Sequence, residues 1–345
     1  MSDNINLDNN ASSSNIKVGI IGYGFSGKNI HSRLIAATPG LEIKKVCDQH
    51  ASLQDDYPFT LVDNVEAVFT DPEIELVVIA TPNLTHFPLA KAALLAGKNV
   101  VVDKPFTVTV AEAEELAALA ISQQRILCPF QNRRYDNNFL TVRKLLEEKA
   151  LGEVRYLESN YTMFQPSVNA GWREKNTQGS GVWFDLGAHL IDQMVQLFGE
   201  PQQSFVTFDT QREGASSPDF FHGTFVYPSL RVVLHGTLLS AWEPPRFRIN
   251  GTEGSFVKYG QDPQEEALVA GTQPGSPGWG YDEQPGKLHR REGDQVIETT
   301  YQGVNGNYPA FYLQLRDALR GEGEPPVKVE QALATMRIIE NTPRL

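Results

Sequence analysis

The sequence predicts an α/β protein in two parts, a doubly wound parallel sheet followed by an α+β region with a large, mostly antiparallel sheet. Before about residue 130, short apolar runs alternate with helical patterns, which is typical of parallel strands joined by crossover helices. The first apolar run leads directly into a glycine-spaced turn. After residue 130, longer segments alternate apolar and polar residues, as strands do when one face is covered.

The first part contains apolar runs without period-two alternation, which favours strands buried on both faces. The expected strands are Ile16–Ile21, Leu41–Cys47, Leu76–Ala80, Asn99–Val102 and Ile126–Phe130. The helices expected between them include 26–37, 86–96 and 110–124. Residues that directly follow a strand lie at its carboxyl end, where open α/β sheets bind ligands.

The second part is expected to begin with a helix over 136–149. The strands expected after it are 154–164, 204–209, 220–227, 231–239 and 246–250. Residues 261–293 are rich in Gly and Pro and are interpreted as a loop. Two helices, at about 310–320 and 329–340, are expected to end the sequence.

Length and composition narrow the class of protein. The 345 residues allow about two domains, predicted at 16–130 and 131–345 after a flexible polar tail over 1–15. The net charge of −12 without a basic cluster argues against nucleic acid, and no apolar run is long enough to span a membrane. The tail lacks the pattern of a signal peptide, so a cytoplasmic location is expected. Cys47 and Cys128 indicate neither a disulfide framework nor a thiolate metal site, and no metal is predicted.

The glycine-spaced turn predicts a dinucleotide site formed by Gly22, Tyr23, Gly24, Phe25, Ser26 and Gly27. Gly22 permits the tight bend, Gly24 allows close approach of a pyrophosphate, and Gly27 allows the next helix to pack on the strand. The alternative is a structural turn without a ligand. The strand before the turn and the helix pattern after it favour the dinucleotide.

Asp48 ends the second strand, twenty-one residues after Gly27, where an acidic side chain accepts hydrogen bonds from ribose hydroxyls. No Arg follows it closely to hold a 2′-phosphate, so NAD is favoured and NADP remains possible. The alternative for Asp48 is a solvated loop acid.

Two further groups could carry chemistry. Asp185 and His189 lie four residues apart on one face of a predicted apolar helix, with Asp192 near the same face. Histidine can transfer a proton near neutral pH, and a neighbouring carboxylate can orient it or hold a substrate hydroxyl. Lys104 ends an apolar strand before Pro105, and a lysine partly removed from water can take part in proton transfer. The alternatives are a buried structural His–Asp pair, an Asp185 helix cap and a surface lysine.

The combination of these motifs resembles the glucose–fructose oxidoreductase / inositol dehydrogenase (Gfo/Idh/MocA) family. The resemblance rests on the glycine turn, on Asp103-Lys104-Pro105 and on Asp185-x-x-x-His189, in that order. The segments Gln131 to Asp136, Gly171 to Glu174 and Asp185 to Gln193 resemble the bacterial scyllo-inositol dehydrogenase branch. The resemblance covers nearly the whole chain after the tail.

This resemblance implies a Rossmann dinucleotide-binding domain and a C-terminal domain whose open sheet mediates homodimers or homotetramers. It implies nicotinamide-dependent oxidation of a secondary alcohol of a sugar or cyclitol. Lys104 would contact substrate and nicotinamide ribose, His189 would act as acid and base, and Asp185 would anchor the polyol. Asp103 replaces the usual Glu, and Asp48 stands where this branch often has Ser or Thr, so the NADP use of the branch does not carry over.

The remaining predicted cofactor residues follow from position or from the same resemblance. They are Thr81, Pro82, Asn83, His86, Asp103, Arg133, Trp172 and Arg173. His86 could equally begin a helix, and the arginines could form structural ion pairs. Two other functions stay open, namely a cofactor-binding sensor without turnover and an NAD-dependent glycoside-processing enzyme that regenerates its cofactor in each turnover.

Overall fold

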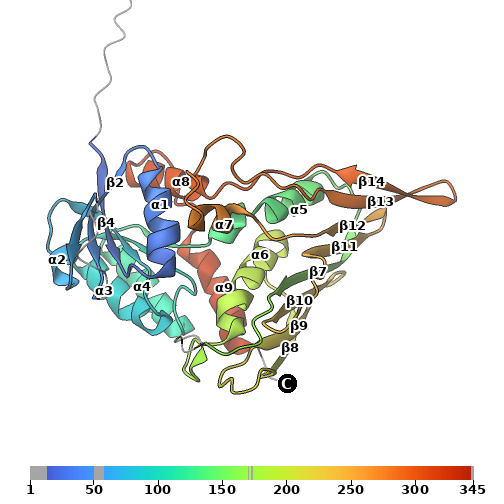
Figure 1. Ribbon diagram of the computed structural model, residues 1–345, viewed down its shortest axis with the longest axis horizontal. Coiled ribbons are helices and arrows are strands. Elements are labelled where there is room, and N and C mark those ends of the chain that lie inside the picture. Colours follow the sequence, from blue (N-terminus) through green and yellow to red (C-terminus); the bar gives the residue numbers. More distant parts are fainter. Residues whose placement is uncertain (1–13, 50–57, 170, 172–173, 343–345) are drawn as a thin grey trace, which may run out of the picture.

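The computed structural model describes residues 14–49, 58–169, 171 and 174–342, arranged around two separate β-sheets. Figure 1 shows the six-stranded sheet with its helices on one side of the molecule and the eight-stranded sheet on the other. This arrangement confirms the predicted fold class. The predicted tail lies largely outside the described residues. No helix in the described part of the chain has the length and apolar character needed to cross a membrane.

The first sheet is entirely parallel and has the strand order β3-β2-β1-β4-β5-β6. This order places the topological switch point at β1, where open α/β sheets bind ligands. Its central strands consist almost wholly of β-branched and leucine side chains, because helices cover both faces. The strands are β1 (Ile16–Ile21), β2 (Leu41–Cys47), β3 (Thr60–Val62), β4 (Ile74–Ile79), β5 (Asn99–Val102) and β6 (Leu127–Pro129).

The helices of this half follow the expected positions, with one added α-helix. They are η1 (Gly27–His31), α1 (Ser32–Ala36), α2 (Glu66–Phe69), η2 (Asn83–Thr85), α3 (His86–Leu95) and α4 (Val110–Ser122). Thr109 and Glu112 form a reciprocal capping box at the start of α4, each side chain bonding the other's backbone N–H. The short α2 and β3 were not predicted, because neither is long enough to show a period.

The second sheet has the order β14-β13-β12-β11-β7-β10-β9-β8 and is antiparallel except where β10 pairs with β7. Its strands alternate, so that residues such as Phe221, Phe225 and Leu234 face one side and are fully buried. The strands are β7 (Val154–Thr162), β8 (Gln203–Asp209), β9 (Phe220–Val226), β10 (Arg231–Thr237), β11 (Phe247–Gly251), β12 (Gly254–Lys258), β13 (Gly286–Glu292) and β14 (Gln295–Tyr301).

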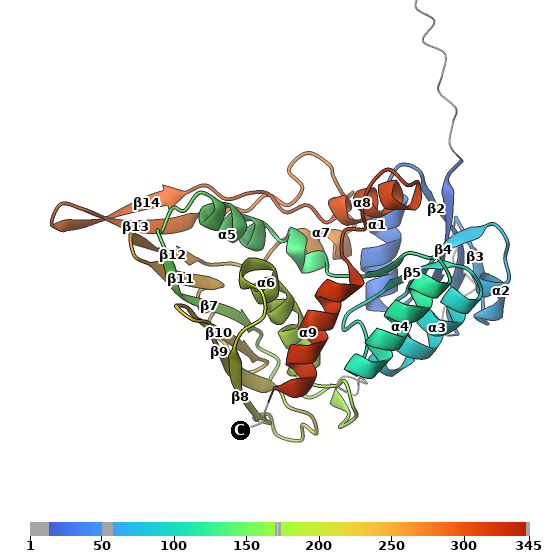
Figure 2. The same cartoon turned by 180° about the vertical axis from the view of Figure 1, so that it is seen from behind.

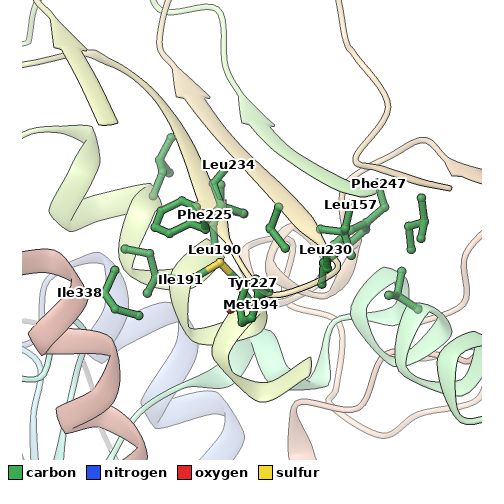
Figure 3. Close-up of a cluster of buried hydrophobic side chains, with 14 of the residues drawn as sticks. Leu157, Leu190, Ile191, Met194, Phe225, Tyr227, Leu230, Leu234, Phe247 and Ile338 are labelled. Carbon is green, nitrogen blue, oxygen red and sulfur yellow. The ribbon is translucent and has the colours of Figure 1, made fainter. Parts of the chain in front are cut away.

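Helices cover the inner face of this sheet. They are η3 (Asn132–Tyr135), α5 (Asn137–Glu147), η5 (Trp183–Gly187) and α6 (Ala188–Phe198). Figure 3 shows Leu190, Ile191 and Met194 of α6 packed against Phe225 and Leu234 of the sheet. This contact fixes α6, and therefore any polar side chain in its first turn, relative to the strands.

The C-terminal helices return to the first sheet. α8 (Pro309–Leu319) contributes Phe311, Tyr312 and Leu315 to a core shared with β1 and α1. α9 (Val329–Asn341) packs against α6 on one side and α4 on the other, as both views show. The two sheets are therefore held together by a segment that lies far from the first sheet in the sequence.

The interpretation of residues 261–293 as a loop was wrong in part. The segment contains α7 (Gln264–Val269) and β13, which forms a long hairpin with β14 that projects from the body in Figure 2. β13 carries five polar or charged residues in seven, so it lacks the apolar alternation of a half-buried strand. Leu288 is its one large apolar side chain that reaches the core.

Candidate active site

The glycine turn after β1 is shaped by close backbone contacts. Gly22 has φ +91°, and a Cβ there would lie 2.5 Å from the carbonyl oxygen of Ala80. A Cβ on Gly27 would lie 2.0 Å from the carbonyl oxygen of Gly22. A Cβ on Gly24 would meet nothing within 4 Å. Two glycines therefore make the bend possible, and the third leaves open space for a ligand.

Asp48 lies beside this turn, directly after β2. Its Oδ2 accepts a hydrogen bond of 2.6 Å from the backbone N–H of Tyr23. The Tyr23 ring packs edge-on against Phe59, with ring centroids 5.5 Å apart. The carboxylate is thus fixed at the turn and lines the same cavity as Gly22 and Gly24.

A cavity of about 920 Å³ extends from the glycine turn to the inner side of the second sheet. This volume is in the range of small-molecule and cofactor sites. Most of the predicted site residues line it: Gly22, Gly24, Phe25, Ser26, Asp48, Thr81, Pro82, Asn83, Asp103, Lys104, Arg133, Asp185 and His189. Tyr23, Gly27 and His86 are not among the lining residues. Trp172 and Arg173 lie outside the described residues.

Lys104 and Asp185 meet in this cavity from opposite halves of the molecule. Lys104 follows β5, and its Nζ lies 2.5 Å from Asp185 Oδ1 and 2.7 Å from the Asp185 backbone oxygen. Asp185 is in η5, a π-helical turn, and such turns are frequent at functional sites. The two side chains are only partly exposed, at 15% and 33%. The pair therefore joins the end of the parallel sheet to the start of α6.

His189 lies in the first turn of α6 and is 5% exposed. Burial lowers its pKa well below the ordinary value, and the positive charges of Lys104, Arg133 and Arg246 lower it further. Its Nδ1 is buried without a hydrogen-bond partner among the described residues. The neutral form of the imidazole is therefore favoured, and its affinity for a proton is reduced.

The loop after β4 forms another wall. Asn83 donates a hydrogen bond of 2.6 Å from Nδ2 to the carbonyl oxygen of Gly179, which links the two halves a second time. His86 lies between the carbonyl oxygens of Thr81 and Pro105, 2.8 Å from each. His86 therefore positions the cavity wall and does not itself line the cavity.

Arg133 lines the cavity next to β7. Its Nη2 is 2.7 Å from Glu265, and its guanidinium lies over the Tyr161 ring at 4.9 Å. Arg133 is thus an ion-paired residue that also faces the cavity.

Asp192 does not belong to the cavity but forms an ion pair with Arg134. The guanidinium of Arg134 donates to both carboxylate oxygens of Asp192, at 2.7 and 2.8 Å. This pair is buried and structural.

The structure adds residues that the sequence did not indicate. His31 is 3.7 Å from Asp103 and 2.6 Å from the Tyr312 hydroxyl. Burial raises the pKa of Asp103, but the neighbouring His31 ring and Ser26 hydroxyl bring it well below its ordinary value. Arg212 and Glu174 line the cavity on its far side. No local pattern marks either pair, because the partners come from distant segments. No cluster of three or more metal-ligating side chains occurs in the part of the chain that the structure describes.

These features are those of a dinucleotide-dependent oxidoreductase, in which the nucleotide site of a parallel sheet shares a cavity with ionisable side chains from the second half of the chain. The comparisons with known proteins agree. Residues 16–130 match the model of the oxidoreductase family with an NAD-binding Rossmann fold, and residues 143–344 match its C-terminal alpha/beta domain. The chain belongs to this Gfo/Idh/MocA family and is an NAD(P)-dependent dehydrogenase.

Several relatives span nearly the whole chain. The uncharacterized oxidoreductase YdgJ of Escherichia coli is 51% identical over 95% of both chains. The scyllo-inositol 2-dehydrogenase (NADP(+)) IolW of Bacillus subtilis is 38% identical over 94% of this chain and 92% of its own. The solved structure of YPO2259 from Yersinia pestis is 44% identical, with a TM-score of 0.91 over 96% of this chain and 95% of its own.

The glycine contacts predict different outcomes for two alanine substitutions. Gly27→Ala places a Cβ against the Gly22 carbonyl, so it lowers the melting temperature and weakens NADH binding. Gly24→Ala meets no protein atom, so it keeps the melting temperature and weakens NADH binding alone. Thermal unfolding and NADH fluorescence titration measure both effects. Unchanged NADH affinity in Gly24→Ala would contradict the binding of pyrophosphate at this turn.

Proposed function

We propose that this dehydrogenase oxidises a secondary alcohol of an uncharged polyol, a cyclitol such as scyllo-inositol or a sugar. The observation that carries the proposal is the convergence of Lys104, Asp185 and His189 on the cavity that also holds the glycine turn. The proton-handling groups thus share one enclosed space with the dinucleotide site. Retention of all three favours turnover over a purely regulatory sensor.

The proposed roles follow from the charges in the cavity. His189 is the proposed acceptor of the proton of the reacting hydroxyl, because it lines the cavity together with Lys104 and Asp185. Burial and neighbouring cations lower its pKa, which keeps the ring in the neutral form that a base needs and also makes it a weaker base. Lys104 donates hydrogen bonds that hold the hydroxyl oxygen and its negative charge as the proton leaves. Asp185 holds the amine of Lys104 and anchors a polyol hydroxyl. A nicotinamide cofactor held at the glycine turn and Asp48 would supply the hydride acceptor for the carbon that bears the alcohol.

An uncharged substrate is supported by how the cavity cations are paired. The lysine and arginines that line it in the described part of the chain are Lys104, Arg133 and Arg212. They pair with Asp185, Glu265 and Glu174 respectively. A sugar acid or phosphate would have to compete with these carboxylates, whereas hydroxyls can bond to both partners. The similarity to the scyllo-inositol 2-dehydrogenase of Bacillus subtilis adds support for a cyclitol.

Assembly through the open face of the second sheet belongs to the same proposal. Figure 1 shows helices on one face of β7–β10, and the outward residues of β8 include Phe205, which is 47% exposed. A second copy covering this face would give the homodimer or homotetramer expected from the sequence. Light scattering of the purified chain tests it, and a monomer at micromolar concentration would count against it.

Substitution of His189 tests the proton acceptor. His189→Ala is expected to lower kcat for polyol oxidation by about a hundred- to ten-thousandfold, while NADH binding is retained. Lys104→Met is expected to lower kcat similarly, because it removes the hydrogen bonds to the substrate oxygen. Steady-state kinetics with scyllo-inositol, myo-inositol and D-glucose, together with NADH titration, separate the two effects.

His289→Ala is the matched control, since His289 lies on β13 and does not line the cavity. It should keep wild-type kinetics. Near-wild-type turnover in both His189→Ala and Lys104→Met would remove these residues from the mechanism.

The pH dependence tests the charges around His189. Oxidation requires the neutral imidazole, so kcat/KM is expected to be constant near neutral pH and to fall only below pH 6.5, as the pH passes through the lowered pKa. Arg133→Met removes one of the cations that lower this pKa, so the acidic limb should move to higher pH. Arg143→Met, at an exposed position of α5, should leave the limb in place. A limb that does not move in Arg133→Met would contradict the assignment to His189.

The cofactor preference is tested at Asp48. Its carboxylate should repel a 2′-phosphate, so we expect NADH to bind about tenfold or more tightly than NADPH. Asp48→Ser should reduce this ratio, because it removes the negative charge beside the Tyr23 N–H. Asp63→Ser removes an equal charge outside the cavity and should preserve the ratio. Calorimetric titration with both nucleotides measures it. Tighter binding of NADPH by the wild-type protein would overturn the preference.

A further inference from the structure

The substrate side of the cavity includes a long connection between β7 and η5. Gln165, Asn169 and Glu174 of this connection line the cavity. The described residues of the connection form no long helix and only one isolated β-bridge, at Phe164. A wall of this kind can define a substrate only if something else holds it in place.

Arg212 provides that support. It lies in the connection between β8 and β9, and its side chain is 1% exposed. Its Nη1 donates to the backbone oxygens of Gln165 and Ser167, at 3.2 and 3.4 Å. Its Nη2 lies 3.0 and 2.7 Å from the two carboxylate oxygens of Glu174. One guanidinium therefore holds the connection at three points.

The guanidinium is itself fixed to the sheet. Its Nε donates to Asp219 Oδ2 at 2.8 Å, and Asp219 also accepts the backbone N–H groups of Gln211 and Arg212. Asp219 is 1% exposed and directly precedes β9. Ser216 donates a hydrogen bond to the backbone oxygen of Glu174, so this residue is held through both its side chain and its backbone.

The carboxylate of Glu174 keeps capacity for further bonds. An ionised carboxylate has about four lone-pair sites on its two oxygens, and Arg212 uses one on each. Glu174 is 13% exposed at its side chain and lines the cavity, so the remaining sites can accept hydrogen bonds from hydroxyl groups. Neither Arg212 nor Glu174 pairs with Lys104, Asp185 or His189 in the contacts of the described residues.

We propose that Arg212 is a positioning residue for substrate specificity, which fixes Glu174 and residues 165–167 against the ring hydroxyls remote from the reacting carbon. This inference rests on the proposed polyol dehydrogenase function. It assigns recognition to a Glu174–Arg212–Asp219 network that lies apart from the proton-transfer group. Loss of this network should weaken polyol binding and discrimination without slowing proton transfer.

Three substitutions test this role. Arg212→Met removes both the positive charge and the planar guanidinium with its several donors. Arg212→Lys keeps the charge but loses the guanidinium, and Glu174→Gln keeps the size of the side chain but loses its negative charge. Arg290→Met is the matched control, because it removes an arginine that donates to the Ala150 backbone oxygen outside the cavity. Glu174→Gln also serves as the variant to measure if Arg212→Met fails to fold.

The measurements are KM and kcat for scyllo-inositol and myo-inositol, the dissociation constant of NADH, and the melting temperature. These two cyclitols differ in the configuration of one ring hydroxyl. For Arg212→Met and Glu174→Gln we expect KM to rise about tenfold or more, with kcat within about threefold of wild type and unchanged NADH affinity. The ratio of kcat/KM between the two cyclitols should move toward one, and Arg212→Lys should fall between wild type and Arg212→Met.

Two outcomes would overturn the role of Arg212 while leaving the proposed function intact. One is wild-type turnover with an unchanged cyclitol ratio in all three variants. The other is a parallel loss of kcat, NADH affinity and melting temperature, which indicates a general structural role. Absence of turnover with any polyol by the wild-type enzyme would instead overturn the proposed function, and this inference with it.

Discussion

The contact between Lys104 and Asp185 is the constraint on which the site depends. Lys104 follows the central parallel strands, and Asp185 precedes the helix that packs on the second sheet. Because the amine bonds both the carboxylate and the backbone oxygen of Asp185, it fixes a position and an orientation. The pair is largely shielded from water, so it is screened less than a surface ion pair. The two halves therefore share one defined point inside the cavity.

The cations that line the cavity in the described part of the chain are ion-paired, whereas the His189 imidazole is held in its neutral form. Lys104, Arg133 and Arg212 each have a carboxylate partner, which limits the field that a substrate meets. His189 instead has a buried Nδ1 without a partner among the described residues, and burial with three nearby cations disfavours its charged form. Lys104 and Arg133 thus belong to both groups: each is paired with a carboxylate, and each still disfavours the charged form of the imidazole.

Much of this could be predicted from the sequence because the signals are local. Gly22 and Gly27 meet steric requirements within six residues, and the apolar runs of β1, β4 and β5 directly reflect burial on both faces. Other features depend on partners remote in the chain. His31 meets Tyr312 across 281 positions, and Arg212 meets Glu174 across 38 positions. The polar strand β13 depends on pairing with β12 and β14, since its own residues show no apolar alternation.

The two ends of the cavity are built by different kinds of contact, and this difference decides which residues can be substituted. At the nucleotide end the backbone is fixed sterically, since a single Cβ on Gly22 or Gly27 would collide with a carbonyl oxygen. At the far end the wall is held by side chains, with Arg212 joining Asp219 to Glu174. A steric limit permits almost no substitution, whereas an ion-pair network can be rebuilt residue by residue. If the Arg212 network recognises the substrate as we propose, substrate specificity can therefore change while the nucleotide site stays the same.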